Sequence, residues 1–435
     1  MIHYPSSLAA VLVISLLVPP WSVEAVPLGM PSSPTVLPAS GSQAQAKVDD
    51  GLKSLHADDL AAAEAAFREA ARIDPKLASA YIGLAEVAGR QNKPARVEYW
   101  LQQALAAEPA NATVQRVWGR QQHQSGRYVE AEAAFKKAVA LDPQSAEAQI
   151  NLAENYLFGL KKAKLAESAY RAAIALEGGN AQAHLGLAAT LGALGRPDDA
   201  LLEYEMAVKL APQDPKYRLA QARYYSSRAK FDQALIVLQE AIALDPAFLP
   251  AYIDRGDLFL AKNELEQAVA TYRAAIKAVP GAAIAYFRLG TVFVGQRRWA
   301  DAEQAYLDAI KIQPAMFAAY NNLAYMAAVR KEKLDDALTW AKKAIELAPK
   351  MTTLQDTLGW VHYARGELVP AAQALEKAVA GNPKKASFHY HLGVVYQEQG
   401  KKKEAIAALR KALELDREFN QAADIQKRLH ALGSK

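Results

Sequence analysis

Prolines recur along the chain at a fixed spacing of 34 residues. The step holds over two series, Pro75 to Pro143 and Pro212 to Pro314. Gly178 stands in the gap, displaced by one residue; Pro349 follows after 35 residues and Pro383 after 34 more. Proline cannot continue a helix, so each marks a turn into the next unit. A fixed period of this length predicts a linear array of small units rather than independent globular domains.

Each unit also carries one pattern of side-chain sizes. When the proline is numbered 32, position 8 is glycine or alanine in eleven units: Gly51, Ala85, Gly119, Ala153, Ala188, Ala222, Gly256, Gly290, Ala324, Gly359 and Gly393. Positions 20, 24 and 27 are small, large and small, as in Ala131, Phe135 and Ala138. Small residues let two helices approach, and the large side chain fills the space between them. The pattern predicts an all-α fold.

Residues 44–419 resemble the tetratricopeptide repeat (TPR) family on these positions. The resemblance implies eleven helix-turn-helix repeats that form a solenoid, a right-handed superhelix whose first helices line a concave groove. Arg417 in place of proline and Ala341 in place of a large residue depart from the pattern. Residues 420–435 are predicted to be a capping helix and tail, because Ala422, Ile425 and Leu429 share one face and a terminal repeat otherwise exposes its apolar side.

The N-terminal residues 1–25 are typical of a signal peptide. Leu8 to Val18 form an apolar run that is too short to span a bilayer, and Val23-Glu24-Ala25 offers a small-residue cleavage site after Ala25. Residues 26–43 are rich in proline and serine and are predicted to be a linker. We expect a periplasmic or secreted protein with no integral membrane span in the mature chain. An uncleaved anchor or a misread start are the alternatives.

Composition and motifs point away from catalysis. The formal net charge is only +5 and no long basic run occurs, so nucleic acid is not an expected partner. The absence of cysteine excludes disulfides and thiolate metal sites. No nucleophile, zinc-protease or phosphate-loop motif occurs, and His389 and His391 fall on opposite sides of a helix. We therefore expect no enzyme activity, no catalytic residue, no metal and no cofactor.

Aromatic and amide side chains cluster where the family's first helices face the groove. This predicted partner-binding patch, the aromatic patch, contains Phe287, Asn321, Tyr325, Asp356, Trp360, Tyr363 and Tyr390. Aromatic rings beside amide and carboxylate groups suit an extended peptide or sugar rings. Trp360 would be a costly exposed apolar group unless a partner covers it. The alternative is that the rings only pack between neighbouring repeats.

A second predicted groove patch, the basic patch, is formed by Arg90, Arg116, Arg120 and Arg223. The alternative is that these arginines only keep the groove solvated and bind no partner. Positions 5 and 9 of the repeats lack the lysine and asparagine that chaperone-type TPR proteins use to grip a C-terminal carboxylate. That class of partner is therefore disfavoured.

These features favour a non-catalytic protein-protein interaction scaffold in a bacterial cell-envelope assembly. Residues 319–409 also resemble, weakly, the C-terminal repeats of TPR proteins of exopolysaccharide export and PEP-CTERM systems. A carbohydrate-binding accessory of exopolysaccharide synthesis or secretion is the alternative function, and an enzyme regulator is a third. Peptide and glycan both remain open as groove ligands.

Export can be tested directly on protein from a native host. The apolar run and the small-residue site predict that the mature chain begins at Val26. N-terminal sequencing of the purified protein measures this. Intact chain beginning at Met1 in the soluble cytoplasm would contradict the prediction.

Overall fold

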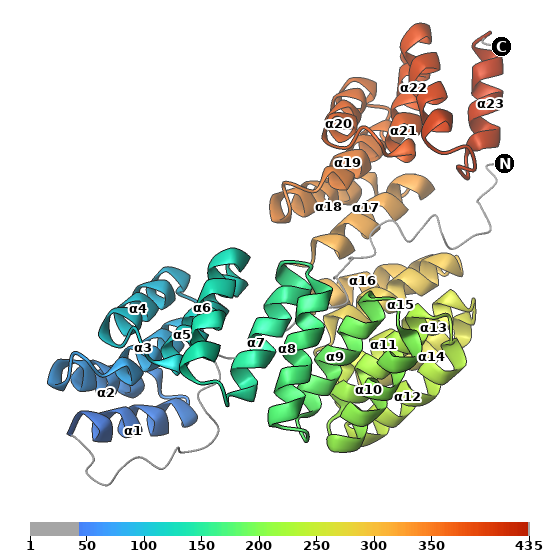
Figure 1. Ribbon diagram of the computed structural model, residues 1–435. Coiled ribbons are helices and arrows are strands. Elements are labelled where there is room, and N and C mark those ends of the chain that lie inside the picture. Colours follow the sequence, from blue (N-terminus) through green and yellow to red (C-terminus); the bar gives the residue numbers. More distant parts are fainter. Residues whose placement is uncertain (1–42, 434–435) are drawn as a thin grey trace. The chain divides into compact units, whose positions relative to one another are not determined.

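The computed structural model describes residues 43–433. The predicted signal peptide and nearly all of the predicted linker lie outside these residues. The described part contains 23 α-helices and one π-helical turn, and no strand (Figure 1). The predicted all-α class and solenoid of helix pairs are confirmed. The chain divides into two compact units between Val237 and Leu238, and each unit is described by itself.

Odd-numbered helices up to α21 are the first helices of repeats, and even-numbered helices are the second. The N-terminal unit contains α1 (Gln43–His56), α2 (Leu60–Ile73), α3 (Ala78–Arg90), α4 (Pro94–Ala107), α5 (Ala112–Gln124), α6 (Tyr128–Leu141), α7 (Ala146–Glu154) with the π-turn η2 (Asn155–Gly159), α8 (Ala163–Leu176), α9 (Ala181–Ala193), α10 (Pro197–Leu210) and α11 (Pro215–Ser227). The division falls within α12 (Phe231–Leu244). The C-terminal unit contains α13 (Leu249–Ala261), α14 (Leu265–Ala278), α15 (Ala283–Gly295), α16 (Trp299–Ile312), α17 (Phe317–Arg330), α18 (Leu334–Leu347), α19 (Thr352–Ala364), α20 (Leu368–Gly381), α21 (Ala386–Glu398), α22 (Lys402–Leu415) and α23 (Ala422–Ala431).

The large side chain at position 24, which we call the wedge, holds neighbouring helices together. Phe67 is fully buried between two glycines, Gly51 of its own repeat and Gly83 of the next. A Cβ atom on these glycines would lie only 2.6 and 2.4 Å from the Phe67 ring. Gly256 approaches the wedge Tyr272 in the same way. The small and large residues of the sequence pattern are therefore in direct contact with each other.

A left-handed residue at position 15 ends the first helix in the described repeats. The positive φ residues are Asp58, Asn92, Gly126, Lys161, Gly195, Ala229, Asn263, Arg297, Lys331, Gly366 and Gly400, with Lys161 displaced by one residue. After α3, Asn92 N donates to Gly89 O and Lys93 N to Ala88 O, each at 2.9 Å, which closes the helix end. Glycine and asparagine tolerate this conformation, whereas alanine, arginine and lysine are strained in it.

Two repeats contain one extra residue, and the fold absorbs each insertion differently. After α7, Leu160 N donates to Asn155 O at 2.9 Å, so the helix widens into the π-turn η2. After α17, the turn instead holds two left-handed residues, Lys331 and Lys333, with φ of 57° and 50°. In both cases the second helix starts one residue late and the repeat resumes.

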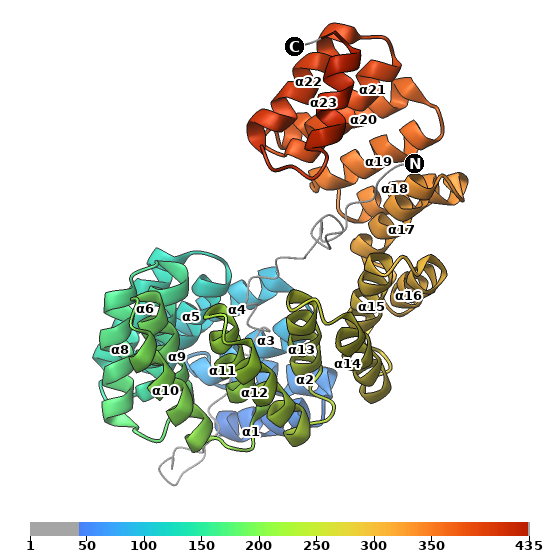
Figure 2. The ribbon, with the colours of Figure 1, turned by 90° about the vertical axis from the view of Figure 1, so that its right-hand side faces the viewer.

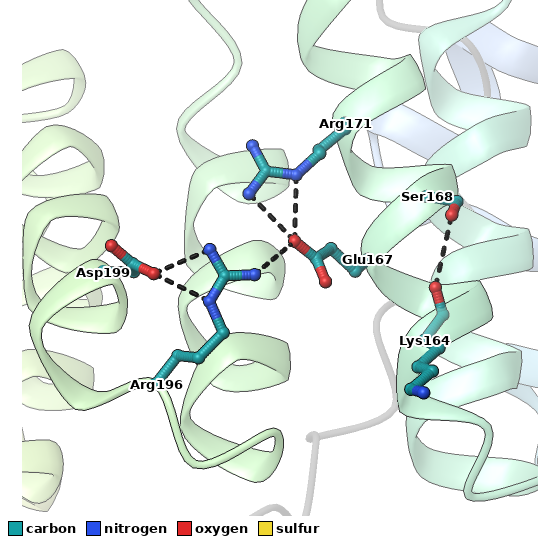
Figure 3. A network of polar contacts seen from close by, with 6 residues as sticks. All are labelled: Lys164, Glu167, Ser168, Arg171, Arg196 and Asp199. Atoms are coloured by element: carbon teal, nitrogen blue, oxygen red, sulfur yellow. Dashed lines mark hydrogen bonds and ion pairs between the residues drawn. The ribbon is translucent and has the colours of Figure 1, made fainter.

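Ion pairs between successive repeats follow a regular pattern. Glu167 on α8 accepts from Arg196, which precedes α10, at 2.8 Å, and also from Arg171 of its own helix at 2.9 Å (Figure 3). Hydrogen bonding to Arg171 lowers the pKa of Glu167; burial opposes this, and hydrogen bonding to Arg196 lowers the pKa further. Equivalent pairs join Glu98 to Arg127, Glu132 to Lys162 and Glu303 to Lys333. Such exposed pairs contribute about 0–1 kcal/mol each, so they tune the stacking rather than drive it.

The predicted cap region forms α23, which packs against α22 (Figure 2). Ile425 is fully buried and joins Leu409 and Ala412 of α22 in one apolar cluster. Leu429 packs against the same cluster. The helix therefore covers the end of the last helix pair with its apolar face.

The strained turn at position 15 can be measured with two opposite substitutions in the N-terminal unit. No atom lies within 4 Å of a Cβ built on Gly126, so Gly126→Ala should cost only the left-handed strain, about 1–2 kcal/mol of unfolding free energy. Ala229→Gly should relieve that strain and gain about 0.5–1 kcal/mol after the greater chain entropy of glycine is subtracted. Urea denaturation measures both. If neither substitution changes the free energy of unfolding, the turn is unstrained.

Candidate partner-binding site

The predicted aromatic patch lies on four first helices of the C-terminal unit: α15, α17, α19 and α21. Phe287, Asn321 and Asp356 are buried, with 2%, 6% and 7% of their surface exposed. Tyr325, Trp360, Tyr363 and Tyr390 are half-buried. The burial therefore separates three residues that are inside the solenoid from four rings that retain surface.

Phe287 is a core residue, which corrects its predicted place on an open groove. Its ring centroid lies 5.7 Å from that of Tyr306, the wedge of the same repeat. Position 5 is close to the wedge, so a large side chain there is drawn into the core. For Phe287 the packing alternative describes the structure.

Asp356, His391 and Trp360 form one connected group. Nδ1 of His391 lies 2.8 and 3.0 Å from the two carboxylate oxygens of Asp356. The His391 ring stacks on Trp360 with centroids 4.3 Å apart, and Tyr363 lies 4.8 Å from Trp360 on its own helix. The bond to His391 satisfies the buried carboxylate, and the two rings fix the orientation of the indole.

Sequence reasoning missed His391. It stands at position 6, the position at which Gly83 meets the preceding repeat's wedge. A bulky polar residue at this position must reach toward the preceding repeat, and that is the signal that could have identified it. His389, two residues earlier, is bonded instead to the Pro383 carbonyl at 2.9 Å. In the part of the chain that the structure describes, no group of three metal-ligating side chains occurs.

Trp360 owes part of its burial to the missing wedge at Ala341. The core here consists of small side chains, with Ala324, Ala337 and Ala341 buried together, and Trp340 and Trp360 pack against them. Trp360 is therefore both a groove residue and part of the packing between repeats. Its removal will cost stability, contrary to the expectation of a freely exposed ring.

Tyr325 lies beside this group. Burial, reinforced by the negative charge of Asp356, raises the pKa of Tyr325 to about 12. The hydroxyl therefore remains a neutral hydrogen-bond donor and acceptor over the whole physiological range. On the same helix, Oδ1 of Asn321 is buried and has no hydrogen-bond partner among the described residues. An unsatisfied buried acceptor is costly, and a donor from a ligand or a water would satisfy it.

Tyr390 and Tyr363 border on the capping helix. The Tyr390 hydroxyl donates to Asp424 at 2.9 Å, and Arg428 Nε donates to the same carboxylate oxygen at 2.6 Å. Arg428 also donates to Gln397 at 3.0 Å. Burial raises the pKa of Tyr363, and the charges that act on it are those of Glu398, Arg428 and Asp424. The cap thus contributes charged groups to one end of the site.

The predicted basic patch is a set of ion pairs rather than a positive surface. Arg90 bonds to Glu86 at 3.2 Å and to the Leu55 carbonyl at 2.9 Å. Arg116 is only 4% exposed and pairs with Glu147 of the next repeat. Burial lowers the pKa of Arg116, against the opposing effect of Glu147. Glu86 of the same helix pairs with Arg90 and Glu147 of the next repeat pairs with Arg116, so the prediction of a basic groove is corrected for these two arginines.

Arg120 and Arg223 complete the predicted basic patch, on α5 and α11, and both are half-buried. Arg120 lies near Glu154, where its charge opposes the burial that raises the pKa of that carboxyl. His123 on α5 donates from Nδ1 to Oδ1 of Asn155 at 2.9 Å, and Asn155 is fully buried at the start of the π-turn. The bond between His123 and Asn155 connects polar groups of two successive repeats.

Sequence profiles of one family match the chain in several places. Profiles described as "Tetratricopeptide repeat" match residues 122–159, 157–224, 287–352 and 386–419, and one described as "TPR repeat" matches 256–297 and 359–400. Together they cover more than half of the chain. The chain belongs to the tetratricopeptide repeat family. No curated protein matches the sequence. The TPR repeats support a role as a protein-protein interaction scaffold. The TPR fold is typically non-catalytic.

Several solved structures have a similar fold. The APC/C hetero-tetramer Cut9-Hcn1 is 16% identical, with 89% of this chain and 96% of that chain covered and a TM-score of 0.46. Yeast Tom70 is 15% identical, with 90% and 95% covered and a TM-score of 0.45. YrrB, a TPR protein with an unusual peptide-binding site, is 25% identical over 44% of this chain and 97% of that chain, with a TM-score of 0.35. These likenesses concern the fold alone.

The Tyr325 hydroxyl should titrate far from the ordinary pH of tyrosine. A phenol whose folded pKa is raised contributes stability that is fully present below pH 10 and is lost as pH rises through about 12. The difference in phenolate absorbance between the wild type and Tyr325→Phe isolates this one group. In an Asp356→Asn background the midpoint should move down toward 10. A midpoint near 10 in the wild type would contradict the burial of this hydroxyl.

Proposed function

We propose that this TPR protein is an exported scaffold that holds an extended protein partner in a cell-envelope assembly. The binding site is the half-buried part of the aromatic patch: Tyr325, Trp360, Tyr363 and Tyr390. The observation that carries the proposal is the gathering of these rings, with surface left on each, at groove positions of the three helices α17, α19 and α21.

The chemistry of the site supports a peptide. Half-buried tyrosine and tryptophan rings offer large contact areas that are already ordered, so little conformational entropy is lost on binding. The unpaired acceptor of Asn321 beside them suits an amide donor. First helices α17, α19 and α21 carry few charges, which lowers the cost of desolvating their groove face.

The envelope location rests on the N-terminal sequence, with its apolar run, its cleavage site and its linker. No helix in the described range 43–433 is long and apolar enough to span a membrane. The aromatic rings could also stack on sugars, so a glycan is the competing ligand in the experiments.

Two tryptophans allow a matched test of the site. Trp360 and Trp340 are both half-buried against the same alanine-rich cluster, but Trp340 lies on a second helix, α18. Each change to alanine should lower the free energy of unfolding by less than the roughly 3–5 kcal/mol of a fully buried tryptophan. Only Trp360→Ala should also remove about 2 kcal/mol of partner binding.

The measurement is quantitative pull-down from envelope extracts of the native host, with the folded fraction of each variant determined by thermal denaturation. Equal capture per folded molecule by the two variants would show that the rings are structural and that the partner binds elsewhere.

A further inference from the structure

The side chain at position 4 of a first helix fastens the turn that precedes the helix. It hydrogen-bonds to the carbonyl of the residue six positions earlier, which is the proline at position 32 or its replacement. The residues that make this bond, at distances from 2.6 to 3.2 Å, are Tyr81, Gln115, His184, Arg218, Tyr252 and His389. Four residue types serve, so the position requires a hydrogen-bond donor rather than one particular shape.

The turn between α8 and α9 lacks the proline that stiffens most of the other turns. Gly178 takes its place and Gly179 follows. Neither glycine has a positive φ, and a Cβ atom built on Gly179 would meet no atom within 4 Å, so neither the backbone conformation nor close packing requires glycine there. Two glycines allow the backbone more freedom than a proline does. The position 4 bond from His184 to the Gly178 carbonyl therefore restrains a turn that is otherwise loosely held.

The His184 ring lies between two hydrogen-bond acceptors. Its Nε2 lies 3.2 Å from the Gly178 carbonyl oxygen, and its Nδ1 lies 2.6 Å from a carboxylate oxygen of Glu203 on α10. A neutral imidazole carries one N–H, so it would donate to one acceptor and turn a lone pair toward the other. Only a ring with both nitrogens protonated donates to both. The side chain is 8% exposed, so solvent does not readily replace either bond.

Glu203 is the charged group that faces this ring. The other helices packed against α9 are α7 and α8, and no residue of either forms a hydrogen bond or ion pair with His184. Glu177, at the end of α8, accepts instead from Asn180 at 2.9 Å. Glu154, on α7, accepts from a glutamine of α9 at 3.2 Å. The protonation of His184 is therefore coupled to one carboxylate and one carbonyl.

We propose that pH controls the α8–α9 turn: both bonds of His184 form when the ring carries two protons, and one bond is lost when the ring becomes neutral. Histidine ordinarily changes its charge between about pH 5 and 8, and carboxylates are mostly ionised over this range. Because the closed turn holds one more proton than the open turn, it is most stable at the acid end of the range and opens more often as pH rises. The proposal is independent of what the groove binds.

His389 provides a matched control within the chain. It stands at the same position 4 and makes the same bond, from Nε2 to the Pro383 carbonyl at 2.9 Å. Its Nδ1 has no hydrogen-bond partner within residues 43–433. A neutral ring with its proton on Nε2 is sufficient there, so the turn before α21 should not respond to pH in this range.

Amide hydrogen exchange of the full chain, followed by mass spectrometry, tests the proposal. Exchange rates are divided by those of the unfolded chain at the same pH, which removes the intrinsic pH dependence. Amides of residues 180–184 bond across the α8–α9 turn, and their protection should fall by about three- to tenfold between about pH 5.5 and about pH 8, the effect of one lost hydrogen bond. Protection of residues 385–389, before and at His389, should not change.

Two substitutions separate the titration of His184 from its packing. His184→Gln keeps the position 4 bond, as Gln115 does at 2.7 Å, but cannot titrate. Glu203→Gln supplies an amide that can donate to Nδ1 of a neutral ring. In each variant the protection of residues 180–184 should be the same at both pH values.

Nitrogen-15 chemical shifts of the His184 ring provide an independent check on the wild type, in which both ring nitrogens should be protonated at about pH 5.5. The inference is overturned if the ring is neutral at that pH, or if protection of residues 180–184 in the wild type does not depend on pH. It is also overturned if the dependence persists in either variant, or if residues 385–389 show the same dependence.

Discussion

One side chain in each repeat, the wedge at position 24, fixes how the helices can pack. It fills the space between the two helices of its own repeat and also touches the first helix of the next. Position 8 in its own repeat must therefore be small, as Gly51 is beside Phe67, and Gly83 at position 6 of the next repeat leaves room for the same ring. Because each wedge is shared by only two repeats, stability is built from nearest-neighbour contacts along the chain.

The candidate site lies where a small residue occupies the wedge position. Ala341 occupies the wedge position, so α17 and α19 come into more extensive contact than other successive first helices of the C-terminal unit. Larger side chains pack against the alanines of this cluster, and one of them is Trp360. Trp360 thereby becomes part of the packing between repeats, which holds its ring in place.

The sequence predicted the helix pairs well because proline, the small residues and the wedge act through contacts at fixed spacing. It did not predict the turns. Ala229, Arg297 and Lys331 do not favour a left-handed backbone, yet they adopt it because the packing of two helices outweighs about 1–2 kcal/mol of local strain. Nor could it predict that one insertion becomes the π-turn η2 and the other a double left-handed turn.

The site was predicted only in part, for a related reason. The repeat pattern places a residue on the groove side, but burial depends on what the adjacent repeats put beside it. Phe287 meets the large wedge Tyr306 and is enclosed, whereas Trp360 meets alanines and keeps some surface. Arg116 was expected to be part of a basic surface, but Glu147, thirty-one positions later, pairs with it. Contacts over that separation are set by the stacking of repeats and not by local spacing.

Aromatic rings of the C-terminal unit are held in place by two kinds of contact. Arginine and lysine side chains of the chain itself lie over Phe293, Trp299 and Tyr396. At the candidate site, Trp360 stacks on His391 and Tyr363 and also packs against the alanine-rich cluster. Stacking fixes the positions of the rings without using all of their surface, so the remaining surface is ordered before a ligand arrives. Rings that are ordered in this way would lose little conformational entropy if a partner bound to them.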